Sequence, residues 1–236
     1  MISVCIATYN GEKYIEEQLT SILQQLNDTD EVIVSDDQST DGTLDVIRAL
    51  NDTRIHIVNN PNCHCYPRNF ENALKQSKGD FIFISDQDDI WMDNKIQFMV
   101  EQMQQCDLVV SDAVVVDNNK NVLSPSFYAI RKPKRSFCGN ILKFGYLGCC
   151  IAMKRKVLDL ALPFPSNYEL CTHDNWIFMI ALTYFNVKVL DCPLIMYRRH
   201  NGNSSTGAIN ARKSIFFRLH YRLYLLWNIF IRAKKL

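Results

Sequence analysis

The chain has 236 residues, of which 47% are hydrophobic and 22% are charged, and its formal net charge is +1. A chain of this length can bury a substantial core, as one large domain or two small ones. The near-neutral charge excludes a general electrostatic argument for nucleic-acid binding, so no nucleic-acid partner is expected.

The cysteines indicate a reducing compartment. Nine cysteines, an odd number, occur mostly in apolar contexts, and the opening sequence MISVCIATYN lacks the basic region of a secretory signal. The thiols are therefore expected to be reduced and the location cytoplasmic. The Cys-His-Cys run at residues 63–65 has the wrong spacing for structural zinc, and no second ligand pair is suitably placed.

The first half of the chain alternates between apolar runs and segments of helical periodicity. Strands are predicted at residues 2–7, 31–35, 54–60, 79–85 and 107–116. Helices are predicted at residues 15–26, 39–50, 68–77 and 94–104. This alternation predicts an α/β fold with a Rossmann-like, doubly wound and mostly parallel sheet.

The second half is less regular. A strand is predicted at residues 146–155, a buried helix at 173–185, and one or two strands at 187–199. These elements are expected to extend the same sheet rather than to form an independent domain. From Arg212 onward, basic residues are interleaved with aromatic residues and leucines.

Polar clusters follow four of the predicted strands. They read ATYNGE after the first, SDDQSTDG after the second, PRN after the third and SDQDD after the fourth. In open α/β sheets, ligands bind in the crevice beyond the carboxyl ends of the strands. The four clusters therefore predict one polar binding crevice, whereas a single acidic turn would usually be a solvated loop.

Five motifs carry a resemblance to a known family. In this order, ATYNGEKYIEEQLTSILQQ, EVIVSDDQSTDGT, GDFIFISDQDDIW, HDNW and YRRHNGN resemble family 2 glycosyltransferases of the GT-A fold, nearest the rhamnosyltransferase-like branch of bacterial surface-polysaccharide synthesis. The resemblance covers about residues 1–205. It implies an inverting enzyme that moves a sugar from a dTDP- or UDP-linked donor to a glycan or lipid-linked acceptor.

The resemblance assigns donor-binding roles to the first two clusters. Asp37 matches the family's acceptor for the pyrimidine N–H, and Asp36 either shares that role or caps the following helix. The family's first loop borders the nucleotide at the positions of Thr8, Tyr9 and Asn10.

Arg68 follows the third predicted strand, beside the same crevice. It contacts the base or phosphate of the donor, or it is a solvated residue at the start of a surface helix.

The SDQDD segment resembles the family's DxD motif, with Asp86 and Asp88 as its carboxylates. Along an extended segment, side chains at i and i+2 point the same way, so both can reach one divalent cation. Mg²⁺ or Mn²⁺ would then neutralise the donor's diphosphate, which also places Asp86 beside the nucleotide sugar. Asp89 is expected to cap the next helix.

His200 in YRRHNGN matches a polar position that completes the metal or diphosphate site in many GT-A enzymes. The other interpretation is a structural histidine. Arg198 and Arg199 beside it are candidates to clamp phosphate oxygens.

Asp174 in THDNW corresponds to the family's catalytic acid position at a helix start, where a carboxylate takes the proton of the acceptor hydroxyl. The family often has an acidic pair here, whereas this chain has His173 before Asp174. The simpler role for Asp174 is a helix cap, which is compatible with catalysis. Trp176 is a sugar platform or, at its helical spacing, a core residue.

Two units are predicted: a transferase domain at residues 1–205 and a basic amphipathic helical tail at 206–236. On the tail, one apolar face contains Phe216, Leu219, Leu223, Leu226, Trp227 and Phe230. Arg218, Arg222 and Arg232 lie roughly opposite and interrupt any membrane-spanning run. The tail either lies on the anionic inner face of the cell membrane, near a lipid-linked acceptor, or packs on protein.

Two other classes stay open on the residues alone. Clustered aspartates after strands also suit a metal-dependent phosphohydrolase or nucleotidyltransferase, although no nucleophile near the first strand and no glycine-rich phosphate loop with a lysine is evident. A non-catalytic nucleotide-sugar-binding protein would keep the donor site without turnover.

Overall fold

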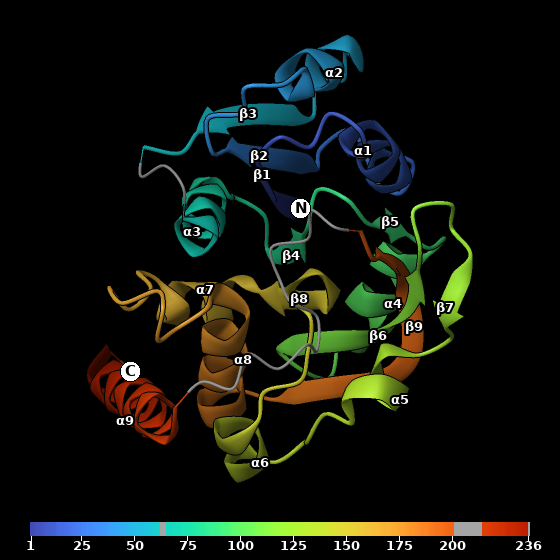
Figure 1. Cartoon of the computed structure of the whole chain (residues 1–236). Helices are drawn as coiled ribbons and strands as arrows, with labels where there is room; N and C mark the ends of the chain where they lie inside the picture. Colours follow the sequence, from blue (N-terminus) through green and yellow to red (C-terminus); the bar gives the residue numbers. More distant parts are fainter. Residues whose placement is uncertain (62–64, 201–213, 236) are drawn as a thin grey trace.

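A computed structural model describes residues 1–61, 65–200 and 214–235 of the chain. Its strands are β1 (Ile2–Thr8), β2 (Glu31–Asp36), β3 (Ile55–Asn59), β4 (Phe81–Ser85), β5 (Ile90–Trp91), β6 (Leu108–Val116), β7 (Val122–Ser124), β8 (Ile151–Lys154) and β9 (Val187–Arg198). They form one sheet in the order β3-β2-β1-β4-β8-β6-β9-β5, and β7 pairs with β6 (Figure 1). The α/β fold predicted from the sequence is confirmed.

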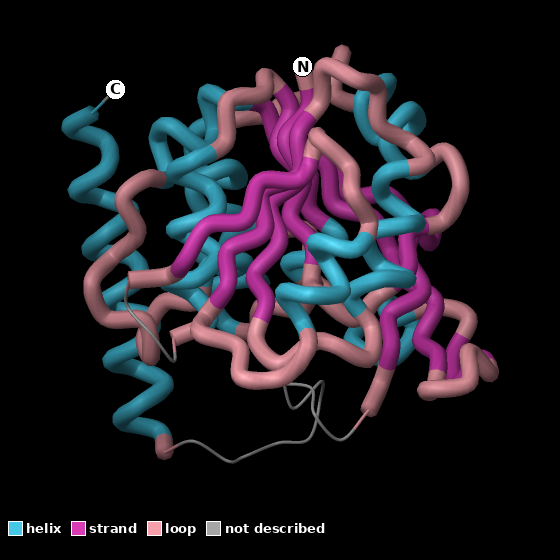
Figure 2. The backbone as a smooth tube through the Cα atoms, turned by 90° about the horizontal axis from the view of Figure 1, so that it is seen from above, coloured by secondary structure: helices cyan, strands magenta, loops and turns pink. Residues whose placement is uncertain are grey.

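The helices lie on both faces of this sheet. They are α1 (Ile15–Leu23), α2 (Thr43–Ala49), α3 (Tyr66–Gln76), α4 (Lys95–Gln102), α5 (Phe127–Arg131), α6 (Phe137–Leu142), α7 (Arg155–Ala161), α8 (His173–Tyr184) and α9 (Ile215–Arg232), with short 3₁₀ turns η1 (Gly148–Cys150) and η2 (Ala233–Lys235). Helices α1, α2 and α4 cover one face, and α3, α7 and α8 cover the other (Figure 1). The sheet twists strongly between these layers (Figure 2).

The position of the site follows from the order of the first four strands. Strand β1 pairs in parallel with β2 on one side and with β4 on the other. The chain therefore builds outward from β1 to β3 and then returns to the opposite side of β1. Ligands bind at such a switch point, beyond the carboxyl ends of the two strands. Here those ends are Thr8 and Ser85.

The second half extends this sheet, as predicted. Strand β8 joins the halves because it pairs antiparallel with both β4 and β6. Strand β9 is one strand parallel to β6, with irregular register where it crosses Asp112. The two-residue and three-residue strands β5 and β7 and the short helices α5, α6 and α7 are not among the predicted elements, since such short segments show little periodicity.

The core confirms the predicted buried helix at residues 173–185. In α8, every residue from Trp176 to Ala181 is fully buried. The Trp176 indole N–H donates to the Ala161 carbonyl at 2.8 Å, so this side chain belongs to the core and is not a sugar platform. The cysteines in the described ranges are free thiols. Cys63 and His64, which belong to the Cys-His-Cys run, lie outside those ranges.

The C-terminal helix α9 packs beside α8 (Figure 1). Leu225 and Ile229 are buried, and the Tyr184 hydroxyl donates to the Ile229 carbonyl at 2.7 Å. Among the residues that the structure describes, no helix combines the length and apolar composition needed to span a bilayer. The predicted boundary between residues 1–205 and 206–236 lies outside the described residues.

Candidate active site

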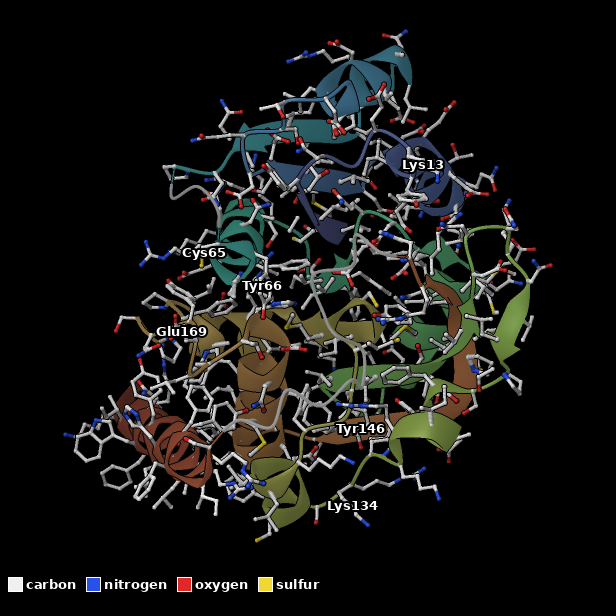
Figure 3. The ribbon with its side chains drawn as sticks, viewed as in Figure 1. Lys13, Cys65, Tyr66, Lys134, Tyr146 and Glu169 are labelled. Atoms are coloured by element: carbon white, nitrogen blue, oxygen red, sulfur yellow. The ribbon has the colours of Figure 1, made fainter. Side chains whose placement is uncertain are left out.

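A cavity of about 240 Å³ opens at the switch point between β1 and β4. Six of the predicted site residues line it: Thr8, Tyr9, Asp37, Asp86, Asp88 and Asp174. They come from the ends of β1, β2 and β4 and from the first turn of α8. Tyr66, at the start of α3, lies at the same cavity (Figure 3). The topology thus brings together side chains that are far apart in the sequence.

Gln87 fixes the loop after β1. Its Oε1 accepts the Thr8 hydroxyl at 2.6 Å and the Tyr9 backbone N–H at 2.8 Å, and its Nε2 donates to the Tyr9 carbonyl at 3.1 Å. A Cβ at Gly11 would lie 2.5 Å from Gln87 Oε1, so only glycine permits this approach. The sequence analysis treated Gln87 as the variable residue of the DxD motif and missed this role.

Asn10 and Asp36 join the loops beside the cavity rather than lining it. Asn10 has a left-handed backbone (φ 48°), and its Oδ1 accepts the Thr40 backbone N–H at 2.8 Å. Asp36 accepts the Ser39 backbone N–H at 3.0 Å and the Ser39 hydroxyl at 2.6 Å. Asp36 therefore braces the turn between β2 and α2, which begins only at Thr43.

Asp37 and Asn69 supply polar groups to the cavity wall. Asp37 is 5% exposed, and its Oδ1 accepts the Asn60 side-chain amide at 2.8 Å. Asn69 donates from Nδ2 to the Thr8 carbonyl at 3.1 Å, while its buried Oδ1 has no hydrogen-bond partner within the described ranges. A buried hydrogen-bond acceptor without a partner is costly, so the Asn69 Oδ1 is suited to accept a hydrogen bond from a ligand.

Arg68 lies elsewhere. Its guanidinium group sits 4.7 Å from the centroid of the Tyr168 ring. Together with Cys65 and Glu169, which Figure 3 labels at the same side of the molecule, it lines a second, open cavity of about 650 Å³. The structure therefore separates Arg68 from the cavity that contains Asp37 and Asp86.

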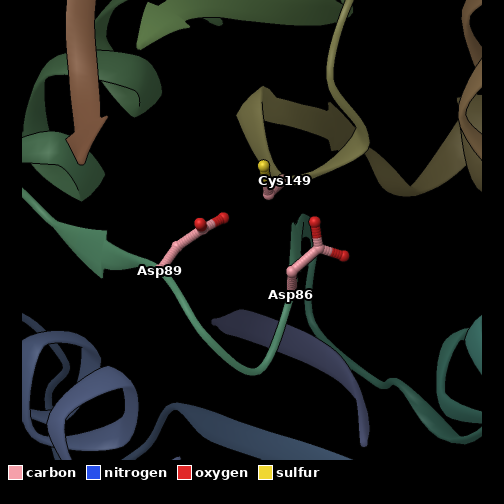
Figure 4. Close-up of side chains that lie close together, drawn as sticks. All are labelled: Asp86, Asp89 and Cys149. Carbon is pink, nitrogen blue, oxygen red and sulfur yellow. The ribbon is translucent and has the colours of Figure 1, made fainter. Parts of the chain in front are cut away.

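The acidic turn after β4 directs its carboxylates to different partners. Asp88 Oδ2 lies 2.7 Å from His200 Nε2, whereas Asp86 and Asp89 approach the thiol of Cys149, with ligand atoms within 4.8 Å of one another (Figure 4). Residues 86–89 bend rather than extend, so the alternation expected of a strand does not apply. Cys149 lies in η1, just before β8, and nothing in its sequence context indicates that it approaches the acidic turn.

Asp89 does not cap a helix, and that expectation was wrong. Helix α4 begins at Lys95, after β5, and Asn94 precedes it. Asp89 is fully buried, and its Oδ1 accepts the Arg198 backbone N–H at 3.0 Å. It therefore ties the acidic turn to the end of β9.

Arg198 also serves the turn rather than a phosphate. Its Nε donates to the Asp88 carbonyl at 2.9 Å, and its guanidinium pairs with Glu17 at 2.5 Å. The His200 ring stacks on Tyr14, with centroids 4.6 Å apart. These contacts hold His200 against Asp88. Arg199 contacts the Tyr197 hydroxyl at 3.2 Å.

Crowding of carboxylates shifts their protonation. Burial, followed by the charges of Asp88 and Asp174, raises the pKa of Asp86 from 3.8 to about 7. Burial, followed by the charges of Asp88 and Asp86, raises the pKa of Asp89 well above its ordinary value. Beneath them, burial lowers the pKa of Lys95 to about 8, and its Nζ donates to the Cys149 carbonyl at 3.0 Å. Without a cation, ionising the carboxyl groups of Asp86 and Asp89 destabilises the folded protein.

This cost predicts a pH-dependent stability. The folded protein keeps the Asp86 proton up to about pH 7, whereas the unfolded chain releases it near 3.8. The protonated Asp86 carboxyl therefore contributes fully to the stability of the fold below the unfolded pKa of 3.8. This contribution is lost as the pH rises through the folded pKa of about 7. In EDTA, Asp86→Asn is expected to raise the thermal midpoint at about pH 8 and to leave it unchanged near pH 4. Equal shifts at both pH values, measured by circular dichroism, would contradict this account.

Asp174 lines the cavity at the start of α8. It lies in the first turn of α8, where the positive end of the helix dipole favours a carboxylate, and its Oδ1 accepts the Asn175 backbone N–H at 2.7 Å. The neighbouring His173 is 6% exposed and stacks on Phe70 with centroids 4.0 Å apart. Burial lowers the pKa of His173, so its ring is neutral.

The ring nitrogens of His173 have no hydrogen-bond partner in the part of the chain that the structure describes. His173 lines the cavity, and a Cβ at Gly148 would lie 2.7 Å from its Nε2. Gly148 thus leaves room for this imidazole beside Asp174. The sequence analysis had taken His173 only as a departure from the family's acidic pair.

A switch-point cavity lined by several carboxylates, with an Asp–His pair beside it, is the arrangement predicted for a nucleotide-sugar transferase. Residues 3–160 match glycosyl transferase family 2, and the chain belongs to that family. Both the predicted family and the enzyme class, a nucleotide-sugar glycosyltransferase, are confirmed. The phosphohydrolase, nucleotidyltransferase and non-catalytic interpretations are set aside.

Two curated relatives extend the match over most of the chain. The dTDP-rhamnosyl transferase RfbG of Shigella flexneri is 31% identical over 233 residues, which cover 91% of this chain and 78% of the relative. The UDP-Glc:alpha-D-GlcNAc-diphosphoundecaprenol beta-1,3-glucosyltransferase WfgD of Escherichia coli is 26% identical, covering 88% of this chain and 80% of that protein. The predicted similarity to rhamnosyltransferase-like enzymes is thus confirmed.

The fold matches a solved glycosyltransferase structure. Staphylococcus aureus TarS, crystallised with UDP-GlcNAc, superposes with a TM-score of 0.73 at 22% identity. The match covers 96% of this chain but 66% of the TarS chain. It supports the predicted GT-A type of sheet.

Proposed function

We propose that this glycosyltransferase is an inverting, metal-dependent enzyme of cell-surface polysaccharide synthesis. It moves a sugar from a dTDP- or UDP-linked donor to a glycan or lipid-linked saccharide. The observation that carries the proposal is the convergence of Asp88–His200, Asp86 and Asp174 on one switch-point cavity. The curated relatives named for dTDP-rhamnosyl transfer and for a diphosphoundecaprenol-linked acceptor support both substrate classes.

The nucleotide is held by the loops after β1 and β2. The Asp37 carboxylate accepts the N–H of the pyrimidine, and the Tyr9 and Thr8 loop, fixed by Gln87, borders the ribose and base. Asn69 offers its unpartnered Oδ1 to a donor hydroxyl or N–H. Asp36 and Asn10 act indirectly, by holding these loops in place.

The residues present fit a divalent cation. Asp88 and His200 form a ready pair of oxygen and nitrogen ligands, and the buried Asp89 Oδ2 has no hydrogen-bond partner among the described residues. Mg²⁺ or Mn²⁺ held by Asp88, His200 and Asp86 would supply positive charge to the departing diphosphate. The raised pKa of Asp86 supports this proposal, because a cation would offset the crowded negative charge.

Asp174 acts as the general base. Its carboxylate takes the proton of the acceptor hydroxyl as that oxygen bonds to the anomeric carbon, while the bond from the same carbon to the diphosphate oxygen breaks. Attack opposite to the leaving group inverts the anomeric centre. His173 beside it, neutral and with both nitrogens available to a ligand, orients a hydroxyl of the donor or acceptor sugar.

A donor screen tests the proposed function. Release of nucleotide is measured from UDP-, dTDP- and GDP-sugars with Mn²⁺, Mg²⁺ or EDTA. Release of a nucleoside diphosphate from one donor, abolished by EDTA, is the expected result and identifies the sugar. If no donor bound with or without metal, the proposal would be refuted. Binding without release is resolved by adding membrane extract as a source of acceptor.

A substitution at His173 tests its role separately. His173→Phe keeps the stack on Phe70 and removes two buried nitrogens without partners, so the thermal midpoint is expected to stay equal or rise. The transfer rate is expected to fall by about tenfold, because a sugar hydroxyl loses its partner. Phe70→Leu serves as a control that weakens the stack alone. Unchanged turnover in His173→Phe would assign this residue to packing only.

We also propose that the enzyme acts in the cytoplasm, on the inner face of the membrane, where a lipid-linked acceptor is presented. Residues 1–205 form its transferase unit, and residues 206–236 form a tail that does not take part in transfer. The support is the acceptor in the name of the Escherichia coli relative and the composition of the tail.

A further inference from the structure

Helix α9 is fastened to the protein along one side. Its Arg222 donates to the carbonyls of Ile141 and Leu142 at 3.2 and 2.9 Å, and the Tyr224 hydroxyl accepts the Asn167 backbone N–H at 2.9 Å. Arg232 is buried, and its guanidinium group donates to the Leu162 carbonyl at 2.7 Å and to the Pro163 carbonyl. These contacts fix which side of the helix faces away from the protein.

The opposite side of α9 is apolar and exposed. We call it the outer face; its residues, with exposed fractions, are Phe216 (85%), Leu219 (53%), Leu223 (57%), Leu226 (38%), Trp227 (62%) and Phe230 (64%). They are the same residues that the sequence analysis placed on one stripe. Side chains project from α9 away from α8 at the edge of the molecule (Figure 3). A contiguous apolar surface of this kind marks an interaction site.

The segments that contain α9 and α6 carry basic residues and no acidic ones. Residues 192–236 contain no Asp or Glu, and neither do residues 118–158, which include α6 beside α9. Lys234 is exposed in η2, directly after α9, and Lys134 and Lys143 are exposed on either side of α6; Figure 3 labels Lys134 at the lower edge of the molecule. A second copy would bring the same unbalanced charge to a shared interface. An anionic surface is the complementary partner.

We propose that the outer face of α9, with the basic residues around it, binds an anionic lipid bilayer. The aromatic and leucine side chains enter the boundary between headgroups and acyl chains, and Lys234 and the lysines beside α6 contact lipid phosphates. The helix lies in the plane of the membrane surface. The inference deepens the proposed function, on which it rests for the lipid-linked acceptor.

The placement of α9 connects this surface to the catalytic end of α8. Helix α9 packs on α8, whose first turn carries Asp174. Burial raises the pKa of the α9 residue Tyr221, and the charge of Asp174 contributes to the shift, so the two groups lie within electrostatic reach. The proposed membrane surface and the candidate base are therefore on two helices that pack on each other.

Tryptophan fluorescence tests the proposal directly. Of the three tryptophans, Trp91 and Trp176 are 3% and 0% exposed, whereas Trp227 is 62% exposed. Vesicles of phosphatidylglycerol and phosphatidylcholine are expected to shift the emission to shorter wavelength, and pure phosphatidylcholine is not. Trp227→Phe is expected to keep cosedimentation with the vesicles and to lose the shift. No shift and no cosedimentation with anionic vesicles would overturn the inference.

Matched variants separate apolar and electrostatic contributions. Leu223→Gln is expected to weaken vesicle binding, whereas Leu123→Gln, equally exposed on β7, is expected to leave it unchanged. The double variant Lys143→Gln, Lys234→Gln is expected to weaken binding roughly tenfold or more. Equal loss in the β7 control would overturn the assignment to α9. A blue shift that grows with protein concentration in the absence of vesicles would assign the face to a second copy instead.

Binding requires neither donor nor turnover, so its failure differs from failure of the proposed function. Vesicle binding by a protein that releases no nucleotide would refute the transfer reaction and support the membrane face. Normal transfer to a soluble acceptor without vesicle binding would support the transfer reaction and refute the membrane face.

Discussion

Replacing Asp174 by Asn is expected to lower the turnover number by about 1,000-fold, because a general base contributes about 10²–10⁴ to the rate. The amide keeps the size of the side chain and its place in the first turn of α8 but cannot accept the hydroxyl proton. Donor binding should be nearly unchanged, since the nucleotide is held by the loops after β1 and β2. Single-turnover transfer and donor binding by calorimetry, measured in parallel, separate the two effects.

The control for Asp174→Asn is a carboxylate of similar type outside the cavity. Asp45 is in the first turn of α2 and is highly exposed, so Asp45→Asn removes a helix-start charge without touching the site. Its turnover should stay within about twofold of the parent protein. If Asp174→Asn retained full transfer, its role would reduce to capping, and another group would have to act as base.

The sequence predicts the fold well where one periodicity extends over a whole element. The apolar runs and the helical segments between them suffice to place the polar clusters at strand ends, whereas the switch point between β1 and β4 required the strand order of the structure. The residues that line the cavity follow from that placement. The elements that escaped are those too short to show a period, such as β5 and α5.

Within the site, the sequence could identify functional residues but not all of their partners. Asp88 and His200 are 112 positions apart, and only the family resemblance pairs them. Gln87, Cys149 and the buried Lys95 had no comparable signal, because their roles depend on loops and strands that meet in three dimensions. Asp89 was misplaced for the same reason: an acid that precedes a helix usually caps it, but here β5 intervenes.

The tail illustrates a similar limit. The spacing of Phe216, Leu223 and Trp227 defines an amphipathic helix, and such a stripe serves equally for packing and for a membrane. The structure shows that the stripe faces outward while Leu225 and Ile229 face α8. The orientation about the helix axis, set by contacts far away in sequence such as Arg222 with Ile141, shows that α9 packs on the protein and leaves the stripe exposed; membrane binding by the stripe stays a proposal.

Asp88→Asn is expected to weaken the apparent affinity for Mn²⁺ by roughly 100-fold or more and to lower transfer accordingly at fixed metal concentration. Asp88 and His200 face each other at 2.7 Å, so the variant loses the carboxylate oxygen of the proposed ligand pair. His200→Ala should give a loss of the same order. The double variant should lose little more than either single one, because residues that hold one ion act as a unit.

Manganese titration, followed by transfer and by the electron paramagnetic resonance signal of free Mn²⁺, measures these losses. Glu17→Gln provides a further control: it removes the charge opposite Arg198 but no proposed ligand, so it should disturb the acidic turn only mildly. If Asp88→Asn and His200→Ala bound Mn²⁺ like the parent protein, the cation would have to lie elsewhere. The set formed by Asp86, Asp89 and Cys149 would then be the alternative within the described residues. Cys149→Ser would test it, since a thiolate ligand gives a bound cobalt ion a charge-transfer absorption that serine does not.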